Sequence, residues 1–235
     1  SIFQYLILLF LTNFLSIQSF TNSIATIIIL FLPRMFEFTK EIINNLLDLE
    51  DYHKFFEKVS TQAGTEAPYD DEDFRLYTIA NFKRSNKIRT KVNLDKKLYN
   101  ELNSGTETWT WILITEPWCG DASFTQPIIE AVCLAGDINL KIALRDKEKS
   151  MMNAYLTDEG KSIPKLIVLD EHLTEIFQWG PRPQELQAKI KNLLNNNGSY
   201  DEKLKLAHQW YRKYGSEALQ LELLELIKKN KRSER

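Results

Sequence analysis

The residue best placed for chemistry in this sequence is Cys119, in the stretch TEPWCGDAS at residues 115–123. β-branched and aromatic residues precede it and helical spacing follows it, so the sequence places Cys119 where a strand turns into a helix. Free N–H groups and the positive end of the helix dipole stabilise a thiolate there. We therefore expect an exposed Cys119 with a pKa below the ~8.5 of a free thiol, acting as a catalytic nucleophile.

The neighbours of Cys119 would shape access to the sulfur and its charge. Gly120 would let another chain approach closely. The negative charge of Asp121 opposes the thiolate, yet its carboxylate can also accept from N–H groups in the first helical turn; the sequence does not rank these two effects. Glu116 and Asp121 have no histidine or lysine nearby in sequence, so we do not expect hydrolase chemistry.

A second thiol is missing from the position where redox sites of this kind usually carry one, three residues on, because that residue is Ala122. The other cysteine, Cys133, lies fourteen residues along the same predicted helix, ~21 Å away at ~1.5 Å per residue. A disulfide needs Cα atoms within about 7 Å. We expect Cys133 to be a buried apolar residue.

Composition excludes several classes of function. The chain has 235 residues, 43% of them hydrophobic, and a net charge of −2 that gives no surplus to neutralise phosphates, so nucleic acid is not an expected partner. Two cysteines indicate a reducing, cytoplasmic setting. The three histidines (His53, His172 and His208) lack metal-ligand spacing, and nothing indicates a metal or a cofactor.

The N-terminal 33 residues contain no Asp, Glu, Lys or Arg. Polar residues divide this apolar stretch into two pieces, and no signal-peptide pattern is evident. We expect residues 1–34 to be an upstream extension, with Met35 as the working start. The alternative is a membrane anchor, and Arg34 and Lys40 on its C-terminal side would then hold the domain in the cytoplasm.

Hydrophobic spacing predicts the elements that would position Cys119. The expected helices cover about 37–59, 71–87, 94–103, 119–135, 149–160, 181–196, 200–214 and 216–229, and the expected strands cover 108–116, 138–146, 165–170 and 173–180. The first two strands, joined by a helix, should be parallel, and the last two should form an antiparallel hairpin. The result is an α/β fold with a mixed sheet flanked by helices.

Three local predictions accompany these elements. The helix over 71–87 should bury Phe74, Tyr77, Ile79 and Phe82. The acidic run at 70–73 fits a helix N-terminus better than a cation site. Arg182, in GPRP, fits a solvated helix start better than an anion contact.

The motifs PWCGDA, SIPKLIVLD and WG, followed by a C-terminal helix, resemble the thioredoxin superfamily over about residues 93–195. Further motifs, including LRD and WYRKYG, are similar to an uncharacterised bacterial thioredoxin-like subfamily over about 36–229. The resemblance implies a thioredoxin-like fold at 93–195 with helical extensions at 35–92 and 196–235. It also implies a cis peptide bond before Pro164, with Trp118, Gly120, Asp121, Ile163 and Pro164 contacting the substrate.

Departures from the family pattern limit the activity that the resemblance implies. The second active-site cysteine is replaced by Ala122, and the buried aspartate that assists it is replaced by Leu113. One expectation is an atypical monothiol protein, in which Cys119 forms a mixed disulfide with a protein or small-molecule thiol. The alternative is a non-enzymatic module that binds a peptide or protein partner. The sequence leaves open whether the chain is an enzyme.

Overall fold

The computed structural model describes residues 36–62, 66–102 and 108–231. The expected extension or anchor at 1–34 therefore lies outside the described residues. The helices are α2 (Lys40–Asn45), α3 (Leu49–Thr61), α4 (Glu72–Arg89), α5 (Lys96–Leu102), α6 (Gly120–Ala135), α7 (Lys149–Ala154), α8 (Gln184–Asn195), α9 (Tyr200–Trp210), the π-helix η1 (Tyr211–Gly215) and α10 (Ser216–Lys231). The strands are β1 (Leu47–Asp48), β2 (Thr110–Thr115), β3 (Asn139–Leu144), β4 (Lys165–Leu169) and β5 (Glu175–Trp179).

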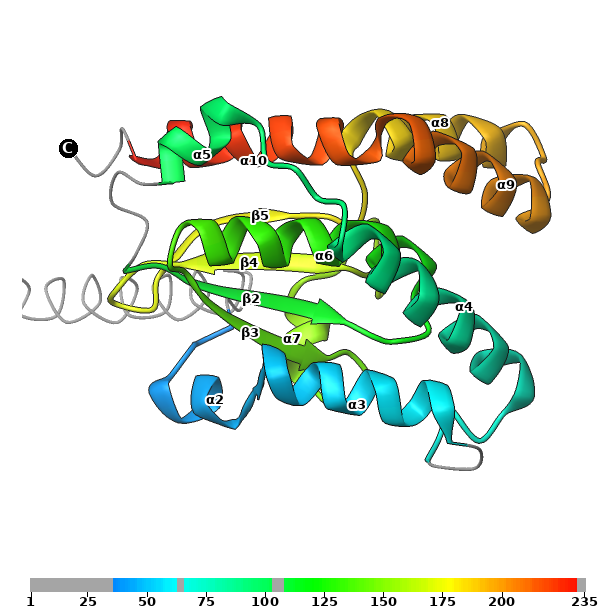
Figure 1. Cartoon of the computed structure of the whole chain (residues 1–235), viewed down its shortest axis with the longest axis horizontal. Helices are drawn as coiled ribbons and strands as arrows, with labels where there is room; N and C mark the ends of the chain where they lie inside the picture. The colour runs from blue at the N-terminus through cyan, green and yellow to red at the C-terminus, as the bar shows by residue number, and fades with distance from the viewer. Residues whose placement is uncertain (1–35, 63–65, 103–107, 232–235) are drawn as a thin grey trace, which may run out of the picture. The chain divides into compact units, whose positions relative to one another are not determined.

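A mixed sheet with the order β1-β3-β2-β4-β5 lies at the centre of the 38–235 unit. β2 and β3 are parallel, and β4 pairs antiparallel with both β2 and β5. This arrangement confirms the predicted parallel pair and hairpin. Figure 1 shows α6 crossing one face of the sheet, α3 running beside β3 and α10 beside β5. The α/β fold class with flanking helices is confirmed.

The central strands are mostly apolar because helices and loops cover both of their faces. β4 is buried at every position, and β2 at every position but its first. Trp109, Trp111 and Trp179 lie in the core. Cys133 is also buried and free, in agreement with its predicted apolar role.

The N-terminal helix predicted over 37–59 is interrupted. α2 ends at Asn45, and β1 pairs antiparallel with β3 through Leu47 and Ile142 before α3 begins. The apolar residues keep their spacing through this break, so periodicity alone did not reveal the two-residue strand. Pairing with the sheet edge decided the local structure.

α4 buries a different face from the one predicted. Thr78, Asn81 and Ser85 are its buried residues, whereas Phe74 and Tyr77 are 38% and 52% exposed. The small and polar residues pack against α6, where the Asn81 amide donates to the backbone oxygen of Pro117. The predicted burial of Phe74 and Tyr77 is therefore wrong, because α4 packs so closely against α6 that only small side chains fit between the two helices.

The cap of α4 agrees with the sequence interpretation. Asp71 accepts hydrogen bonds from the backbone N–H groups of Asp73 and Phe74, which makes the acidic run a helix N-terminus. α5 is capped by Asp95, whose carboxylate accepts from the backbone N–H groups of Lys97 and Leu98.

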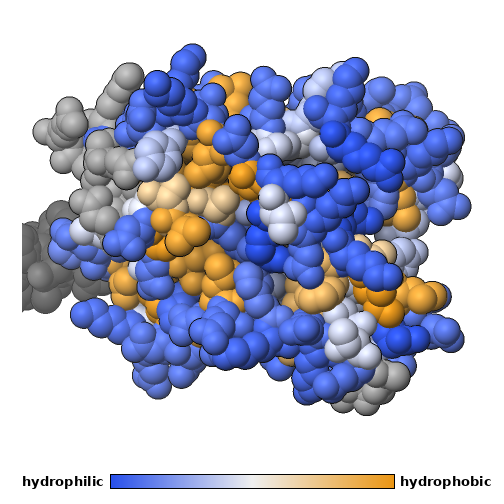
Figure 2. All heavy atoms as spheres, viewed as in Figure 1, coloured by the Kyte–Doolittle hydropathy of each residue, from blue (hydrophilic) through white to orange (hydrophobic). Residues whose placement is uncertain are grey.

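The visible face of the molecule carries two groups of hydrophobic residues separated by hydrophilic ones (Figure 2). Across residues 36–62, 66–102 and 108–231, no helix is both long and apolar enough to cross a membrane.

Candidate functional site

Cys119 is the N-cap of α6, directly after the loop that leaves β2. Its Sγ accepts a hydrogen bond from the Ala122 N–H at 3.4 Å. Its thiol donates to the backbone oxygen of Ile163, also at 3.4 Å. The sulfur therefore bridges the start of α6 and the Ile163–Pro164 loop, whose peptide bond is cis.

The prediction of an exposed, acidic Cys119 is wrong. The residue is only 6% exposed, and burial raises the pKa of its thiol to about 12, with the Asp121 carboxylate adding to the rise. The Ala122 N–H and the Arg182 guanidinium act in the opposite direction and are outweighed. The amides at the start of α6 stabilise a thiolate as expected, but they do not recover the solvation that burial removes.

Asp121 forms an ion pair with Arg182, with 2.6 Å between Oδ2 and Nη2. Both side chains are largely buried, at 14% and 12% exposed. Burial alone would lower the pKa of Arg182, but the Asp121 carboxylate raises it above the ordinary value. Arg182 was expected to be solvated; instead its guanidinium ties the loop after β5 to the first turn of α6.

Glu116, the other carboxylate near Cys119, stabilises the loop between β2 and α6. Its two oxygens accept from the Tyr69 hydroxyl at 2.7 Å and from the Asp146 N–H at 3.0 Å. Burial raises the pKa of this carboxyl, and these hydrogen bonds satisfy it. Glu116 thus fixes the turn that presents Cys119.

A pocket of about 520 Å³ lies beside Cys119. Of the site residues predicted from sequence, Trp118, Cys119, Gly120, Asp121 and Ile163 line it together. Pro164 is buried next to this lining. A pocket of this size falls within the range typical of small-molecule sites.

Aromatic side chains form one wall of this pocket. Phe74 meets the Trp118 ring edge-on at 5.7 Å between centroids. The guanidinium of Arg145 lies 4.4 Å from the centroid of that Trp118 ring. Tyr77 and Tyr200 also line the pocket and are 52% and 62% exposed. These exposed rings supply contact area of the kind that binding sites use.

Positive charge outweighs negative charge around the pocket. Its lining contains five cationic side chains, and Asp121 is the one carboxylate among the described lining residues; the cations are Arg84, Arg145, Lys161, Arg182 and Lys203. Burial lowers the pKa of Lys203, and the neighbouring Arg182 charge lowers it further. The pocket therefore favours an anionic or carbonyl-rich ligand.

The sequence does not predict the aromatic and cationic wall of this pocket. Helical spacing places Phe74 and Tyr77 in the core. Tyr200 and Lys203, in the C-terminal helices, lie far from Cys119 in sequence. One signal was available: residues 74–92 contain six cations and no carboxylate, although the whole chain has a net charge of −2.

Comparison with known proteins places this geometry in a family. The profile of a family described as Thioredoxin matches residues 67–194, which is more than half of the chain. The chain belongs to this thioredoxin family. Membership agrees with the sheet topology and with Cys119 at the start of α6.

Two solved structures share the fold. One is a protein of unknown function from Pseudomonas aeruginosa, with 16% identity, a TM-score of 0.52, and coverage of 82% of this chain and 98% of that one. The other is an HIV epitope scaffold, with 16% identity, a TM-score of 0.54, and coverage of 80% and 96%. At this identity the likeness shows the fold alone. No curated protein matches the sequence.

Proposed function

We propose that this thioredoxin-family protein is a partner-binding module that holds an extended peptide segment in the pocket beside Cys119, with the thiol protonated. The observation that carries the proposal is the state of the sulfur. Cys119 is buried, hydrogen-bonded to the Ile163 carbonyl and raised in pKa, while the rings and cations around it face an open pocket.

The backbone at Ile163 supports a peptide as the ligand. Among the described residues, no group accepts a hydrogen bond from the Ile163 N–H, and Ile163 lines the pocket. A backbone donor beside a pocket is satisfied when a ligand supplies a carbonyl. The carbonyl oxygens of an extended segment provide such acceptors at regular spacing.

Binding is tested with peptides selected from a random display library on the Cys119→Ser protein, which keeps a hydrogen-bonding group but cannot form a disulfide. Selected peptides are then titrated against Tyr77→Ala and against Tyr214→Ala. Tyr77 is in the pocket lining, whereas Tyr214 is 41% exposed and outside it, so the two changes are matched.

We expect Tyr77→Ala to weaken binding about tenfold, a normal loss for an aromatic contact, and Tyr214→Ala to leave it unchanged. The wild-type protein should bind as well as Cys119→Ser. If selection on Cys119→Ser yields no binders, while a parallel selection on the wild-type protein yields peptides held through a reducible link, the proposal is contradicted.

Thiol–disulfide exchange at Cys119 is the second candidate, and one observation favours it. The sulfur lies in the pocket lining, where the Ala122 N–H and Arg182 both lower its pKa against the effect of burial. In this reaction the Cys119 thiolate attacks a partner disulfide, a mixed disulfide forms, and the departing thiolate takes up a proton. One external small thiol then attacks the Cys119 sulfur and releases the partner as a dithiol, and a second small thiol removes the first from Cys119 as a small-molecule disulfide. The partner disulfide is thereby reduced and the two small thiols are oxidised.

The resemblance to an uncharacterised bacterial subfamily with a WCGDA motif fits both candidates, because the lone thiol is compatible with binding and with monothiol exchange. The two candidate functions predict different rates of thiol–disulfide exchange at Cys119. A thiol with a pKa near 12 is almost entirely protonated at pH 7, so exchange with a disulfide reporter such as glutathione disulfide should be very slow.

A further inference from the structure

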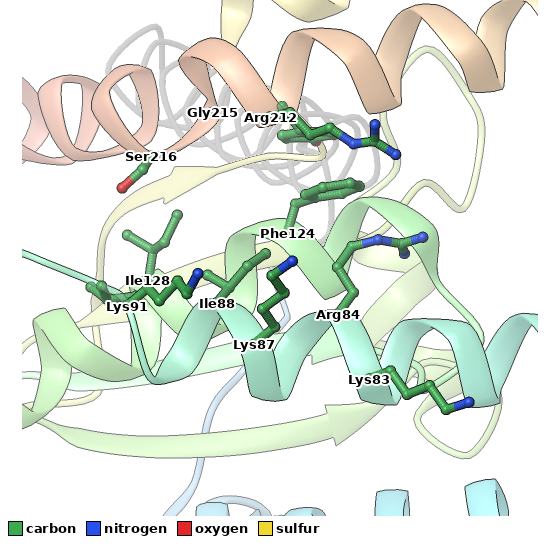
Figure 3. Close-up of a pocket in the computed structure, with 12 residues that line it drawn as sticks. Lys83, Arg84, Lys87, Ile88, Lys91, Phe124, Ile128, Arg212, Gly215 and Ser216 are labelled. Atoms are coloured by element: carbon green, nitrogen blue, oxygen red, sulfur yellow. The ribbon is translucent and has the colours of Figure 1, made fainter.

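A second groove, of about 540 Å³, runs between α4 and the η1–α10 segment. Its cations come from two parts of the chain: Arg84 and Lys87 on α4 with Lys91 in the turn that follows it, and Arg212 on η1 (Figure 3). Lys83 is also in the lining, but its side chain extends away from the others in Figure 3. Among the described residues that line the groove there is no carboxylate.

These cations have no acidic partners in the described part of the chain. No ion pair forms at Arg84, Lys87, Lys91 or Arg212, although Arg89 on the same helix pairs with Glu130. Arg84 is held by hydrogen bonds to the Asn81 and Ser123 oxygens, both at 2.7 Å, which orient its guanidinium without neutralising it.

The spacing of the α4 cations is unfavourable for the helix itself. Arg84 and Lys87 are three residues apart, so their side chains share one face of α4 and repel one another, and Lys91 adds a further positive charge from the turn that follows the helix. Burial lowers the pKa of Arg84, and the positive charge of Arg212 across the groove lowers it further. A negatively charged ligand would remove this repulsion.

The floor of the groove is apolar. It is lined by Ile88 of α4, by Val92 shortly after that helix, and by Phe124 and Ile128 of α6. Figure 3 shows Phe124 between Arg84 and Arg212. The Arg84 guanidinium lies 4.6 Å from the centroid of the Phe124 ring. The groove thus combines an apolar floor with cationic walls.

The groove adjoins the pocket beside Cys119, because Arg84, Phe124 and Tyr211 line both. An occupant of both spaces must therefore be elongated. In an extended peptide, successive side chains point to opposite sides. Alternating apolar and acidic residues would place the apolar ones on the floor and the acidic ones on the opposite side, toward the exposed side chains of Lys87 and Arg212.

We infer that this groove binds an acidic segment of a protein partner, in an extended conformation, through alternating apolar and carboxylate side chains. That this segment belongs to the partner held beside Cys119 rests on the proposed function; the groove's preference for acidic peptide does not. The apolar stretch at residues 1–33 is not a complementary occupant, because it carries no charge.

The test uses a fluorescein-labelled peptide of about ten alternating Glu and Leu residues, long enough to span both spaces at ~3.4 Å per residue. Its binding to the full chain is measured by fluorescence anisotropy, beside a Lys–Leu peptide of the same length. The groove variant combines Lys87→Glu with Lys91→Glu. The control combines Lys58→Glu with Lys96→Glu, which are exposed, outside the lining of the groove, and give the same change in net charge.

We expect the Glu–Leu peptide to bind the wild type and the control equally, and the groove variant about tenfold more weakly or worse. Raising the salt concentration should weaken binding, since the charges lie near the surface. Equal binding by the groove variant and the control, or equal binding of the Lys–Leu peptide, would overturn the inference. So would tighter binding of a single-stranded oligonucleotide with the same number of negative charges, since the groove would then recognise phosphates.

The same measurements separate this inference from the proposed function. If Tyr77→Ala leaves binding of the Glu–Leu peptide intact and the library selection yields no binders, binding by the groove is supported and peptide binding by the pocket beside Cys119 is contradicted. Library peptides that depend on Tyr77 but not on Lys87 and Lys91 would do the reverse.

Discussion

At the scale of single residues, burial decides the chemistry of Cys119. The start of α6 offers the N–H of Ala122 to the sulfur, and that local effect could be read from sequence. The Ile163 loop that closes over the sulfur comes from 44 residues later and could not. A raised thiol pKa beside the pocket is the outcome of these two contributions.

Replacement of Asp121 should change the acidity of that thiol. Its carboxylate is the second cause of the raised Cys119 pKa after burial, so Asp121→Asn should lower the pKa from about 12 but leave it above the ordinary ~8.5, because burial remains. The pH dependence of iodoacetamide labelling measures the shift. Asp70→Asn, an exposed change, should have no effect; a pKa that is unchanged or higher in Asp121→Asn would be inconsistent with this electrostatic account.

A second thiol at position 122 should create a disulfide. Ala122 is buried one helical turn from Cys119, and its N–H reaches Sγ at 3.4 Å. Residues three apart in a helix have Cα atoms ~5 Å apart, within the range of a disulfide. Mass spectrometry of oxidised Ala122→Cys should therefore show the loss of two hydrogens. An oxidised variant in which both thiols stay free would show that the local geometry is wrong.

At the scale of elements, one carboxylate joins three helices. Glu130 on α6 accepts from Arg89 of α4 at 2.7 Å and lies 3.1 Å from His53 of α3. Burial would raise the pKa of Glu130, but the hydrogen bonds to His53 and Arg89 outweigh it and lower the pKa below the ordinary value. The ionised carboxylate therefore stabilises the packing of α3 and α4 against α6.

Glu130→Gln should lower the free energy of unfolding at pH 7 by about 1–3 kcal/mol, since it removes a charged hydrogen-bond acceptor. Because the folded pKa is depressed, this stabilisation is complete above the unfolded pKa of ~4.3 and is lost as the pH falls through the folded value. Urea unfolding at pH 7 and pH 3 should show the difference between wild type and variant shrinking in acid. A difference that grows in acid, or an equal effect of the exposed Glu57→Gln, would contradict this role.

Gly180 controls the placement of the loop that contacts Cys119. Its φ is +113°, and an added Cβ would overlap the carbonyl oxygen of Pro164. Gly180→Ala should therefore destabilise the protein by more than about 1 kcal/mol and displace the Ile163–Pro164 loop. Thermal unfolding measures the first effect and faster labelling of Cys119 the second. Gly120→Ala is the control, because its Cβ would meet nothing within 4 Å; equal stability of the two variants would refute the prediction.

At the scale of the whole molecule, the fold was predictable and the chemistry of the site was not. β2, β3 and the β4–β5 hairpin follow from apolar runs and turns, which are local signals. β1 is stabilised only by pairing with β3, and α4 buries Asn81 and Ser85 because α6 packs closely against it. Such long-range contacts leave no periodic pattern in the sequence.

The site depended on contacts of the same kind. Cys119, Gly120 and Asp121 are neighbours in sequence and were found together. Tyr77 and Lys203 reach the pocket only through the packing of α4 and α9. The run of cations without carboxylates at residues 74–92 was the one sequence signal for the basic groove, and the near-neutral charge of the whole chain concealed it.

The measurement that tests the central claim most directly is the pH dependence of Cys119 alkylation in the Cys133→Ser protein, followed by mass spectrometry. A protonated thiol beside a binding pocket predicts slow labelling at pH 7 that rises up to and beyond pH 10, in line with a pKa raised to about 12. A labelling midpoint at or below ~7 would contradict it, because Cys119 would then be a thiolate suited to disulfide exchange.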